Sequence, residues 1–362
     1  MKKIKLISLI ACLCLGIALL SVGVWAAVDL DMRITGGVDY EAPIYDADAE
    51  SSYFTFEYSD EVESASAFST ESELTATITG YTDSVERTQL ILPAQVKHAE
   101  KIYAVTSVGD LAFYNCTGLT SIEIPDSVTS IGGYAFYYCT SLANMNYLGT
   151  LKDWVGISFG SENSNPARFT KSLVINGTPI TTIAAEDLEG ATSIGQYAFR
   201  NCTGLTSIEI PDSVTSIGHE AFYYCTGLTS VIIGSGVTSI DQHAFYNCTG
   251  LTSIEIPDSV TSIGQYAFSY CTGLTSAIIG SGVTSMGQYA FRNCTKLTTV
   301  IIDSEKVASG LTSATAKGYL INKAETVYVA EGLTAGSYLT NETYFKIETS
   351  DKAGYVMYKK LS

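Results

Sequence analysis

Histidine, tryptophan and basic residues are scarce in this sequence. Its 362 residues include three His and two Trp, and 20 Lys and Arg stand against 37 Asp and Glu, so the formal net charge is −17. The few histidines leave little material for histidine-based catalysis or metal binding. An acidic chain also lacks the basic face on which nucleic acids and anionic lipid surfaces bind. We therefore expect no nucleic-acid partner and no electrostatic docking on membranes.

Two common enzyme motifs are absent as well. The sequence contains no H-E-x-x-H and no P-loop, the short patterns that mark zinc proteases and nucleotide-binding enzymes. We expect no enzyme activity, no catalytic residues, no metal site and no cofactor.

The N-terminus has the pattern of an export signal. Three lysines precede an uncharged run from Leu6 to Ala27, and the small residues Val24 and Ala26 occupy the positions before a cleavage site. We interpret residues 1–26 as a bacterial signal peptide. The alternative is an uncleaved anchor, because an uncharged run of 22 residues is long enough to span a bilayer. In either case we expect the rest of the chain to be secreted or displayed at the cell surface.

A repeat occupies most of the chain. The seven cysteines outside the leader, from Cys116 to Cys294, are separated by 23, 63, 23, 23, 23 and 23 residues. Residues 202–247 and 248–293 differ at 8 of 46 positions, so two alternating 23-residue units have been duplicated together. A period of 23 is typical of leucine-rich repeats. It predicts a mainly β solenoid, a stack of 23-residue coils with parallel strands and short helical or 3-10 turns.

The side-chain pattern within one unit predicts how a coil folds. Leu205, Ile208 and Ile210 have the L-x-x-L-x-L spacing of a repeat strand, in which the two isoleucines point to the same face. Phe222 recurs in every unit and is expected in the core, where stacked coils bury it. The recurring Gly218 suggests a left-handed backbone, with Asp241 as the one departure.

The cysteines are expected to remain free. Equivalent residues on consecutive coils are parallel and about 4.8 Å apart, which is too wide for the Cβ separation of a disulfide. Secretion would permit disulfides, but seven is an odd number. We expect a ladder of buried thiols.

The breaks in the period suggest a division of the chain. We expect an acidic N-terminal segment with a small β module at 27–72, an N-terminal cap at 73–115, the solenoid at 116–299, a variant coil with an insertion at 141–201, and a C-terminal cap at 300–362. Within the variant coil, Ser161 to Pro166 reads as a protruding polar loop. Val174-Ile175, Asn176-Gly177 and Ile180 to Ile183 read as a hairpin or a strand pair.

The repeat motif CTxLTSIxIPxSVTSIGxxAFxxC closely resembles the BspA-like leucine-rich repeat family. The resemblance covers about residues 75–345 and rests on the residues of one unit and their equivalents: Leu205, Ile208, Ile210, Pro211, Val214, Ile217, Gly218, Ala221, Phe222 and Cys225. It implies a secreted or cell-surface protein, mainly of host-associated bacteria. Members of that family are described as adhesins and binders of host proteins.

Two surfaces are candidate protein-binding sites. The outward strand position forms a stripe of acid and isoleucine: Glu209, Ile232, Glu255, Ile278 and Ile301. Two tyrosine columns, Tyr223 with Tyr246 and Tyr266 with Tyr289, would combine apolar area with a hydroxyl group. The alternatives are that the stripe only reflects the duplication and that the tyrosines only pack along the solenoid.

A third group contains metal-binding residue types. His219, Glu220, Asp241 and His243 lie on adjacent coils at positions that vary freely between repeats. We interpret them as two surface histidines beside acids, because zinc hydrolysis needs three protein ligands and an open position.

These observations favour a monomeric protein-binding module that adheres to host or neighbouring cells. A glycan-binding module would use the tyrosine columns instead. A passive spacer would make its contact through residues 28–72. The expected partners are extracellular proteins or glycans, with membrane contact only through the leader.

Overall fold

The computed structural model describes residues 44–48, 53–59, 74–82, 87–309, 324–335, 344–347 and 352–360. The expected signal peptide lies outside these ranges, as does most of the acidic segment after it. Within them, no helix is long and apolar enough to cross a membrane.

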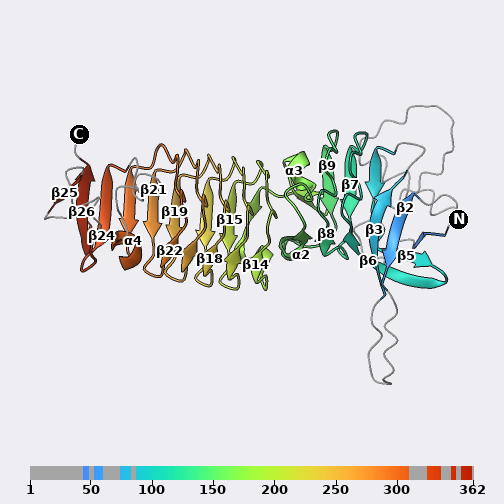
Figure 1. The fold of residues 1–362 in the computed structure, drawn as a ribbon, viewed down its shortest axis with the longest axis horizontal. Helices are drawn as coiled ribbons and strands as arrows, with labels where there is room; N and C mark the ends of the chain where they lie inside the picture. Colours follow the sequence, from blue (N-terminus) through green and yellow to red (C-terminus); the bar gives the residue numbers. More distant parts are fainter. Residues whose placement is uncertain are drawn as a thin grey trace, which may run out of the picture. The chain divides into compact units, whose positions relative to one another are not determined.

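The repeats form a solenoid, as the period predicts (Figure 1). Each regular coil contributes a four-residue strand and then a two-residue strand. The longer strands are β15 (Ser207–Ile210), β17 (Ser230–Ile233), β19 (Ser253–Ile256), β21 (Ser276–Ile279) and β23 (Thr299–Ile302). The shorter ones are β14 (Ser193–Ile194), β16 (Ser216–Ile217), β18 (Ser239–Ile240), β20 (Ser262–Ile263) and β22 (Ser285–Met286). Paired strands are parallel with a register of 23, as in the pairing of Ile208 with Val231.

The core is a set of columns that run through the stack. Ile208 and Ile210 are buried, as the period-two pattern predicts. The ring of Phe245 lies 4.9 Å from that of Phe222 and 5.1 Å from that of Phe268, at interplanar angles of 3° and 5°. Each phenylalanine therefore depends on its neighbours for burial.

The third side of each coil is a series of hydrogen-bonded turns. Ala221 N donates to Gly218 O and Tyr223 N donates to Glu220 O, which are single turns with the three-residue hydrogen-bond spacing of a 3-10 helix, as expected. Phe222 N and Tyr224 N donate forward to the carbonyls of the next coil, at 2.7 and 2.8 Å. The helices assigned in the described ranges lie elsewhere: α2 (Leu151–Gly156), α3 (Ala167–Thr170), the 3-10 helix η1 (Ala185–Leu188) and α4 (Glu305–Ser309).

The expectation of a left-handed backbone at Gly218 and its equivalents, Asp241 included, is wrong. None of these residues has a positive φ. The glycines are needed because consecutive coils approach closely. A Cβ on Gly264 would lie 2.4 Å from the carbonyl carbon of Asp241 and 2.4 Å from the nitrogen of Gln242.

Left-handed residues occur instead in two other columns of the turn. The first follows the glycine by two residues, with φ between 52° and 63°: Leu111, Tyr134, Tyr197, Glu220, His243, Tyr266 and Tyr289. The second precedes each cysteine, with φ between 59° and 62°: Asn115, Tyr138, Asn201, Tyr224, Asn247, Tyr270 and Asn293. Asparagine tolerates this region, whereas tyrosine persists there only when the surroundings enforce it. The forward hydrogen bonds of the turn provide that enforcement.

The expected thiol ladder is confirmed. The seven cysteines are free, and all but the half-buried Cys116 are buried. Cys225 Sγ donates to Phe199 O at 2.9 Å and Cys248 Sγ donates to Phe222 O at 3.2 Å. Burial raises the pKa of the Cys248 thiol. The thiols thus act as small hydrophobic side chains with one weak hydrogen bond.

Both ends of the stack carry additional strands. At the N-terminal end one sheet has the order β1-β5-β6-β3-β2, and β6 continues into the coils through β8. Its strands are β1 (Tyr45–Asp46), β2 (Phe54–Tyr58), β3 (Thr75–Tyr81), β5 (Gln95–His98), β6 (Lys101–Val108) and β8 (Ser130–Ile131). The other ladder begins with β4 (Gln89–Ile91) on β7 (Ser121–Ile124). At the C-terminal end, β24 (Thr326–Ala330) pairs with β23 and is followed by antiparallel β26 (Tyr355–Lys360) and β25 (Tyr344–Ile347).

The variant coil differs in part from expectation. It contains β9 (Asn144–Tyr147), β10 (Ser158–Phe159), β11 (Val174–Ile175), β12 (Thr178–Pro179) and β13 (Thr182–Ile183). The hairpin around Asn176-Gly177 is present, but its second strand is β12, while β13 pairs with β15 of the next coil.

We expected a protruding loop at Ser161 to Pro166, and this expectation is wrong for its central residues. Asn163, Ser164 and Asn165 are buried. The Asn165 amide donates to the carbonyls of Tyr197 and Ala198 at 2.8 and 2.9 Å. A polar segment can be buried here because its side chains bond the next coil.

Phe245→Ala should lower the free energy of unfolding by about 3–5 kcal/mol, because the ring is fully buried between two others. Urea unfolding measures the change. Ile232→Ala, which truncates an exposed strand residue, is the control and should cost less than about 1 kcal/mol. Similar losses in both variants would contradict the stacked core.

Gly264→Ala should destabilise the chain by about 1–3 kcal/mol, since the new methyl group would overlap the backbone of the preceding coil. Asp241→Ala occupies the same column one coil earlier, where a side chain is already accommodated, and should stay within about 0.5 kcal/mol of the parent. Thermal and urea unfolding of both variants test the close approach. A harmless Gly264→Ala would refute it.

Candidate functional site on the tyrosine face

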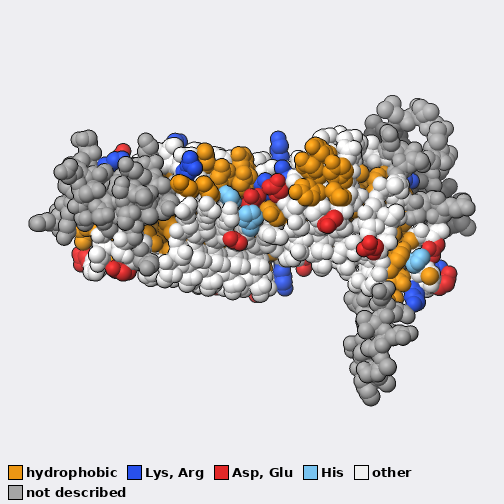
Figure 2. Space-filling view, in the orientation of Figure 1, with side chains coloured by type: hydrophobic (Ala, Val, Ile, Leu, Met, Phe, Trp, Pro, Cys, Tyr) orange, Lys and Arg blue, Asp and Glu red, His pale blue; other side chains and the backbone are white. Residues whose placement is uncertain are grey.

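Aromatic residues gather on the turn side of the coils. We call this surface the tyrosine face and define it by Tyr114, Tyr134, Tyr137, Tyr138, Tyr197, Tyr223, Tyr224, Tyr246, Tyr266, Tyr270 and Tyr289. Figure 2 shows hydrophobic side chains in two groups on one face, with acidic, basic and histidine side chains between them.

The four predicted tyrosines form ladders. The rings of Tyr223 and Tyr246 lie 4.9 Å apart at 7°, and those of Tyr266 and Tyr289 lie 5.2 Å apart at 24°. All four are half-buried, and burial raises the pKa of Tyr223 and of Tyr246. Because the ring faces are turned to one another, mainly edges and hydroxyl groups reach solvent.

A further tyrosine column was missed as a candidate. Tyr138, Tyr224 and Tyr270 are 47%, 41% and 37% exposed, more than the predicted pairs. Tyr270 packs against Tyr246 with ring centroids 5.3 Å apart. The signal was present in the sequence, since the residue before each cysteine alternates between Asn and Tyr.

The strand stripe presents alternating acid and isoleucine. Glu209 pairs with Ile232, and Glu255 pairs with Ile278. Ile232 is 55% exposed between two exposed acids, whereas Ile278 and Ile301 are half-buried. Isolated exposed isoleucines are normal on a protein surface, so this arrangement is a weaker candidate than the tyrosine face.

A charged cluster interrupts the tyrosine face. Arg200 occupies the column of Tyr223 and is only 6% exposed. Its Nη2 lies 3.2 Å from Glu162 Oε2 and its Nη1 lies 3.2 Å from Glu220 Oε2. The guanidinium also lies over the Tyr223 ring, 4.1 Å from its centroid. Two carboxylates and one aromatic ring therefore surround this cation.

Histidines complete the cluster. His219 Nε2 lies 3.6 Å from Glu220 Oε1. Burial raises the pKa of Glu220, and the positive charges of Arg200 and His219 oppose that shift. Burial lowers the pKa of His243, with His219 and Arg200 adding to the effect. Its ring is therefore neutral near pH 7.

The structure brings together three of the four metal-binding residue types singled out above. Donor atoms of His219, Glu220 and His243 all lie within 4.8 Å of one another. Asp241 stays apart and bonds the nitrogen of Gln242. We expected both acids to lie at the surface beside the histidines. Asp241 is exposed as expected, but Glu220 is only 9% exposed, so the expectation is wrong for Glu220.

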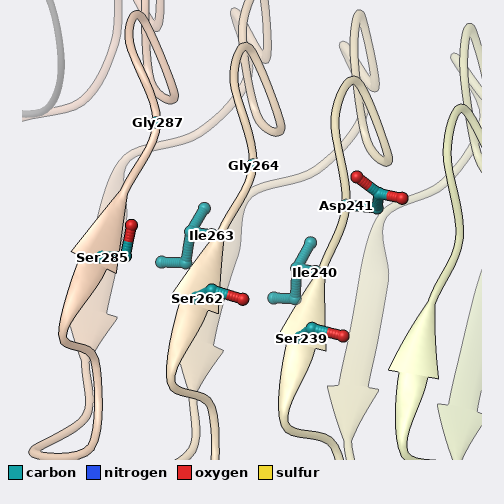
Figure 3. Close-up of a pocket in the computed structure, with 8 residues that line it drawn as sticks. All are labelled: Ser239, Ile240, Asp241, Ser262, Ile263, Gly264, Ser285 and Gly287. Atoms are coloured by element: carbon teal, nitrogen blue, oxygen red, sulfur yellow. The ribbon is translucent and has the colours of Figure 1, made fainter.

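A hollow follows β18, β20 and β22 on another side of the coils. Figure 3 shows serines at matching places on the three strands, Ser239, Ser262 and Ser285, with Asp241 beyond the first strand. Asp241 is the one charged residue among the eight that line this hollow. Its lining repeats with the coils and brings no reactive groups together.

One short motif was overlooked in the sequence. Gly156-Ile157-Ser158-Phe159-Gly160 has the G-x-S-x-G spacing of serine hydrolases. Their serine sits on a sharp turn from a strand into a helix. Ser158 instead lies in strand β10, which follows helix α2 and pairs with β8. The match therefore lacks the structural context of a catalytic serine.

The repeat pattern identifies the family. The family described as the BspA type leucine rich repeat region matches residues 95–177 and 192–310, in six copies. The chain belongs to the BspA-type leucine-rich repeat family. Proteins of this family are repeat scaffolds of a general protein-interaction type and are typically non-enzymatic.

Solved structures provide further comparisons. A leucine-rich cell surface protein from Faecalibacterium prausnitzii A2-165 is 28% identical, and the match covers 67% of this chain and 78% of that one with a TM-score of 0.41. A leucine-rich repeat protein from Bacteroides ovatus ATCC 8483 is 24% identical, with 71% of each chain covered and a TM-score of 0.41. No curated protein matches the chain.

Arg200→Met should lower the free energy of unfolding by about 3–5 kcal/mol, because it leaves Glu220 buried without its partner. Arg292→Met, in the same column on an exposed rung, should change it by less than about 0.5 kcal/mol. Adding Glu220→Tyr, which introduces the residue that the preceding coil has at Tyr197, should recover most of the loss. A double variant no more stable than Arg200→Met alone would show that the loss does not come from an unpaired carboxylate.

Proposed function

We propose that this BspA-type protein is exported by a bacterium and adheres to host or neighbouring cells by binding an extracellular protein through the tyrosine face. The observation that carries the proposal is the exposed column of Tyr138, Tyr224 and Tyr270 above ladders of half-buried tyrosines. Export is supported by the signal-like residues 1–26. Tyrosine is enriched at protein interfaces because one side chain offers both apolar area and a hydroxyl group.

Rigidity supports the same conclusion. Tyr224 and Tyr270 are left-handed residues, and hydrogen bonds to the next coil fix their backbones, from Tyr224 N to Tyr246 O and from Tyr270 N to Arg292 O. Side chains that are already ordered lose less entropy when a partner binds. Repetition along the stack lets many small contacts act together.

A protein ligand fits this surface better than a glycan. Sugar rings stack on open aromatic faces, but the faces in the ladders cover one another, with His243 also stacked on Tyr266 at 5.2 Å and 11°. Edges and hydroxyl groups suit the mixed polar and apolar surface of a protein. The glycan-binding module remains the alternative that the experiment must separate.

The test is a binding screen of the chain against immobilised extracellular-matrix proteins and glycans. Tyr224→Asn combined with Tyr270→Asn should weaken the protein interaction at least about tenfold, since truncation of one interface hot spot costs about 2 kcal/mol. Asparagine is the residue of the alternate coils at these left-handed positions, so the fold should be retained.

Ile232→Asp combined with Ile278→Asp is the matched control on the strand stripe and should leave binding unchanged. Loss of binding in the isoleucine variant alone would move the site to the stripe. Binding to glycans only, or to neither array, would refute the proposal.

A further inference from the structure

Three residues of the charged cluster are departures from an otherwise regular array. The two 46-residue blocks differ at 8 positions, and three of these are His219, Glu220 and His243. The following block has Gln265, Tyr266 and Tyr289 at those places. Two of the three histidines in the chain thus stand, on adjacent coils, where the following block has glutamine and tyrosine.

The stacking of the coils explains why these side chains meet. Glu220 and His243 are consecutive rungs of the same left-handed column, and His219 is the neighbour of Glu220. Their donor atoms lie within 4.8 Å of one another. A tetrahedral zinc ion with bonds of about 2.0–2.2 Å holds its ligand atoms about 3.4 Å apart. Small side-chain rotations would therefore close the group on an ion.

The surroundings orient two of the three donors. Glu220 Oε2 lies 3.2 Å from Arg200 Nη1 in an ion pair without a hydrogen bond, which leaves Oε1 on the side of His219 Nε2. The ring of His243 is stacked on Tyr266, and its Nδ1 is buried with no hydrogen-bond partner in the described part of the chain. Such outer contacts fix the ligands of known metal sites.

The charge of the cluster does not oppose a cation. Arg200 and the more distant Arg168 bring two positive charges, and Glu162, 3.2 Å from Arg200 Nη2, offsets one of them. Glu220 offsets the other, so the four charged groups balance before an ion binds. Both histidines are half-buried, so solvent can reach the cluster.

We propose that His219, Glu220 and His243 bind a divalent transition-metal ion of the zinc class and leave one coordination position open. Two imidazoles and a carboxylate suit zinc, cobalt or nickel. Calcium and magnesium are disfavoured because they require more oxygen ligands than the cluster offers. The site would stand within the tyrosine face but does not depend on that face binding a protein.

The experiment titrates the chelator-treated full chain with Zn²⁺ by calorimetry and with Co²⁺ by visible absorption. One equivalent should bind. His219→Gln and His243→Tyr introduce the residues of the following coils, so the fold should persist. Each should weaken binding at least about tenfold, because loss of an outer contact alone costs roughly 10–100-fold. His98→Gln removes the remaining histidine and is the matched control, with unchanged affinity expected.

Two outcomes would overturn the proposal. One is equal affinity in the parent and in the His219→Gln/His243→Tyr double variant. The other is no saturable binding up to roughly 1 mM ion. X-ray absorption of the zinc-loaded parent gives a check that needs no variant. Nitrogen and oxygen ligands are expected, and sulfur ligands would assign the ion to the cysteines instead.

Discussion

Parallel backbone hydrogen bonds between residues one repeat apart hold consecutive coils at the spacing of a β-ladder, about 4.8 Å. Aromatic rings at equivalent positions must then lie face to face, as Phe222, Phe245 and Phe268 do. The same spacing leaves no room for a Cβ at Gly264, where the turn of one coil crosses the backbone of the coil before it. It also keeps equivalent thiols too far apart for disulfides, so Cys225 and Cys248 bond backbone carbonyls.

Periodicity in the sequence predicts those parts of the fold that repeat. Ile208 and Ile210 could be assigned to the core because a period of two places them on one face. The sequence could not show why glycine recurs at Gly218 and its equivalents. A residue without a side chain suits a left-handed turn and a close approach of two backbones equally well. Tyr224 was overlooked as a site residue since nothing in a sequence shows that its backbone is left-handed and its ring exposed.

Residue types vary between coils at the surface of the stack, whereas the core columns keep nearly the same residue in every coil. Core columns accept few residue types because each side chain packs against its own equivalent, whereas the left-handed columns accept Tyr, Asn, Glu, His and Leu. Differences in recognition between two coils can therefore come from these outer columns, as well as from the strand stripe and from the column of Arg200 and Tyr223. On this chain they produce two aromatic groups with the charged cluster between them. The cluster could be suspected from its residue types, but the burial of Glu220 follows from Arg200, which belongs to the neighbouring coil.

At the variant coil the strand ladders are interrupted, and side-chain hydrogen bonds connect the coils on either side of the break. β9 and β11 lie in a different sheet from β13 and β15, and β10 in a different sheet from β14. Side chains bridge this break: Trp154 Nε1 donates to Ala198 O at 2.9 Å, and Gln196 Nε2 donates to Phe159 O at 2.8 Å.

The buried contact of Arg200 with Glu162 belongs to the same junction, as do the bonds of Asn165 to residues 197 and 198. Polar residues are concentrated here because a broken ladder leaves backbone groups that only side chains can satisfy. Arg200 pairs with Glu162 of this junction and with Glu220 of the next coil, so the charged cluster on the tyrosine face begins where the repeat is broken.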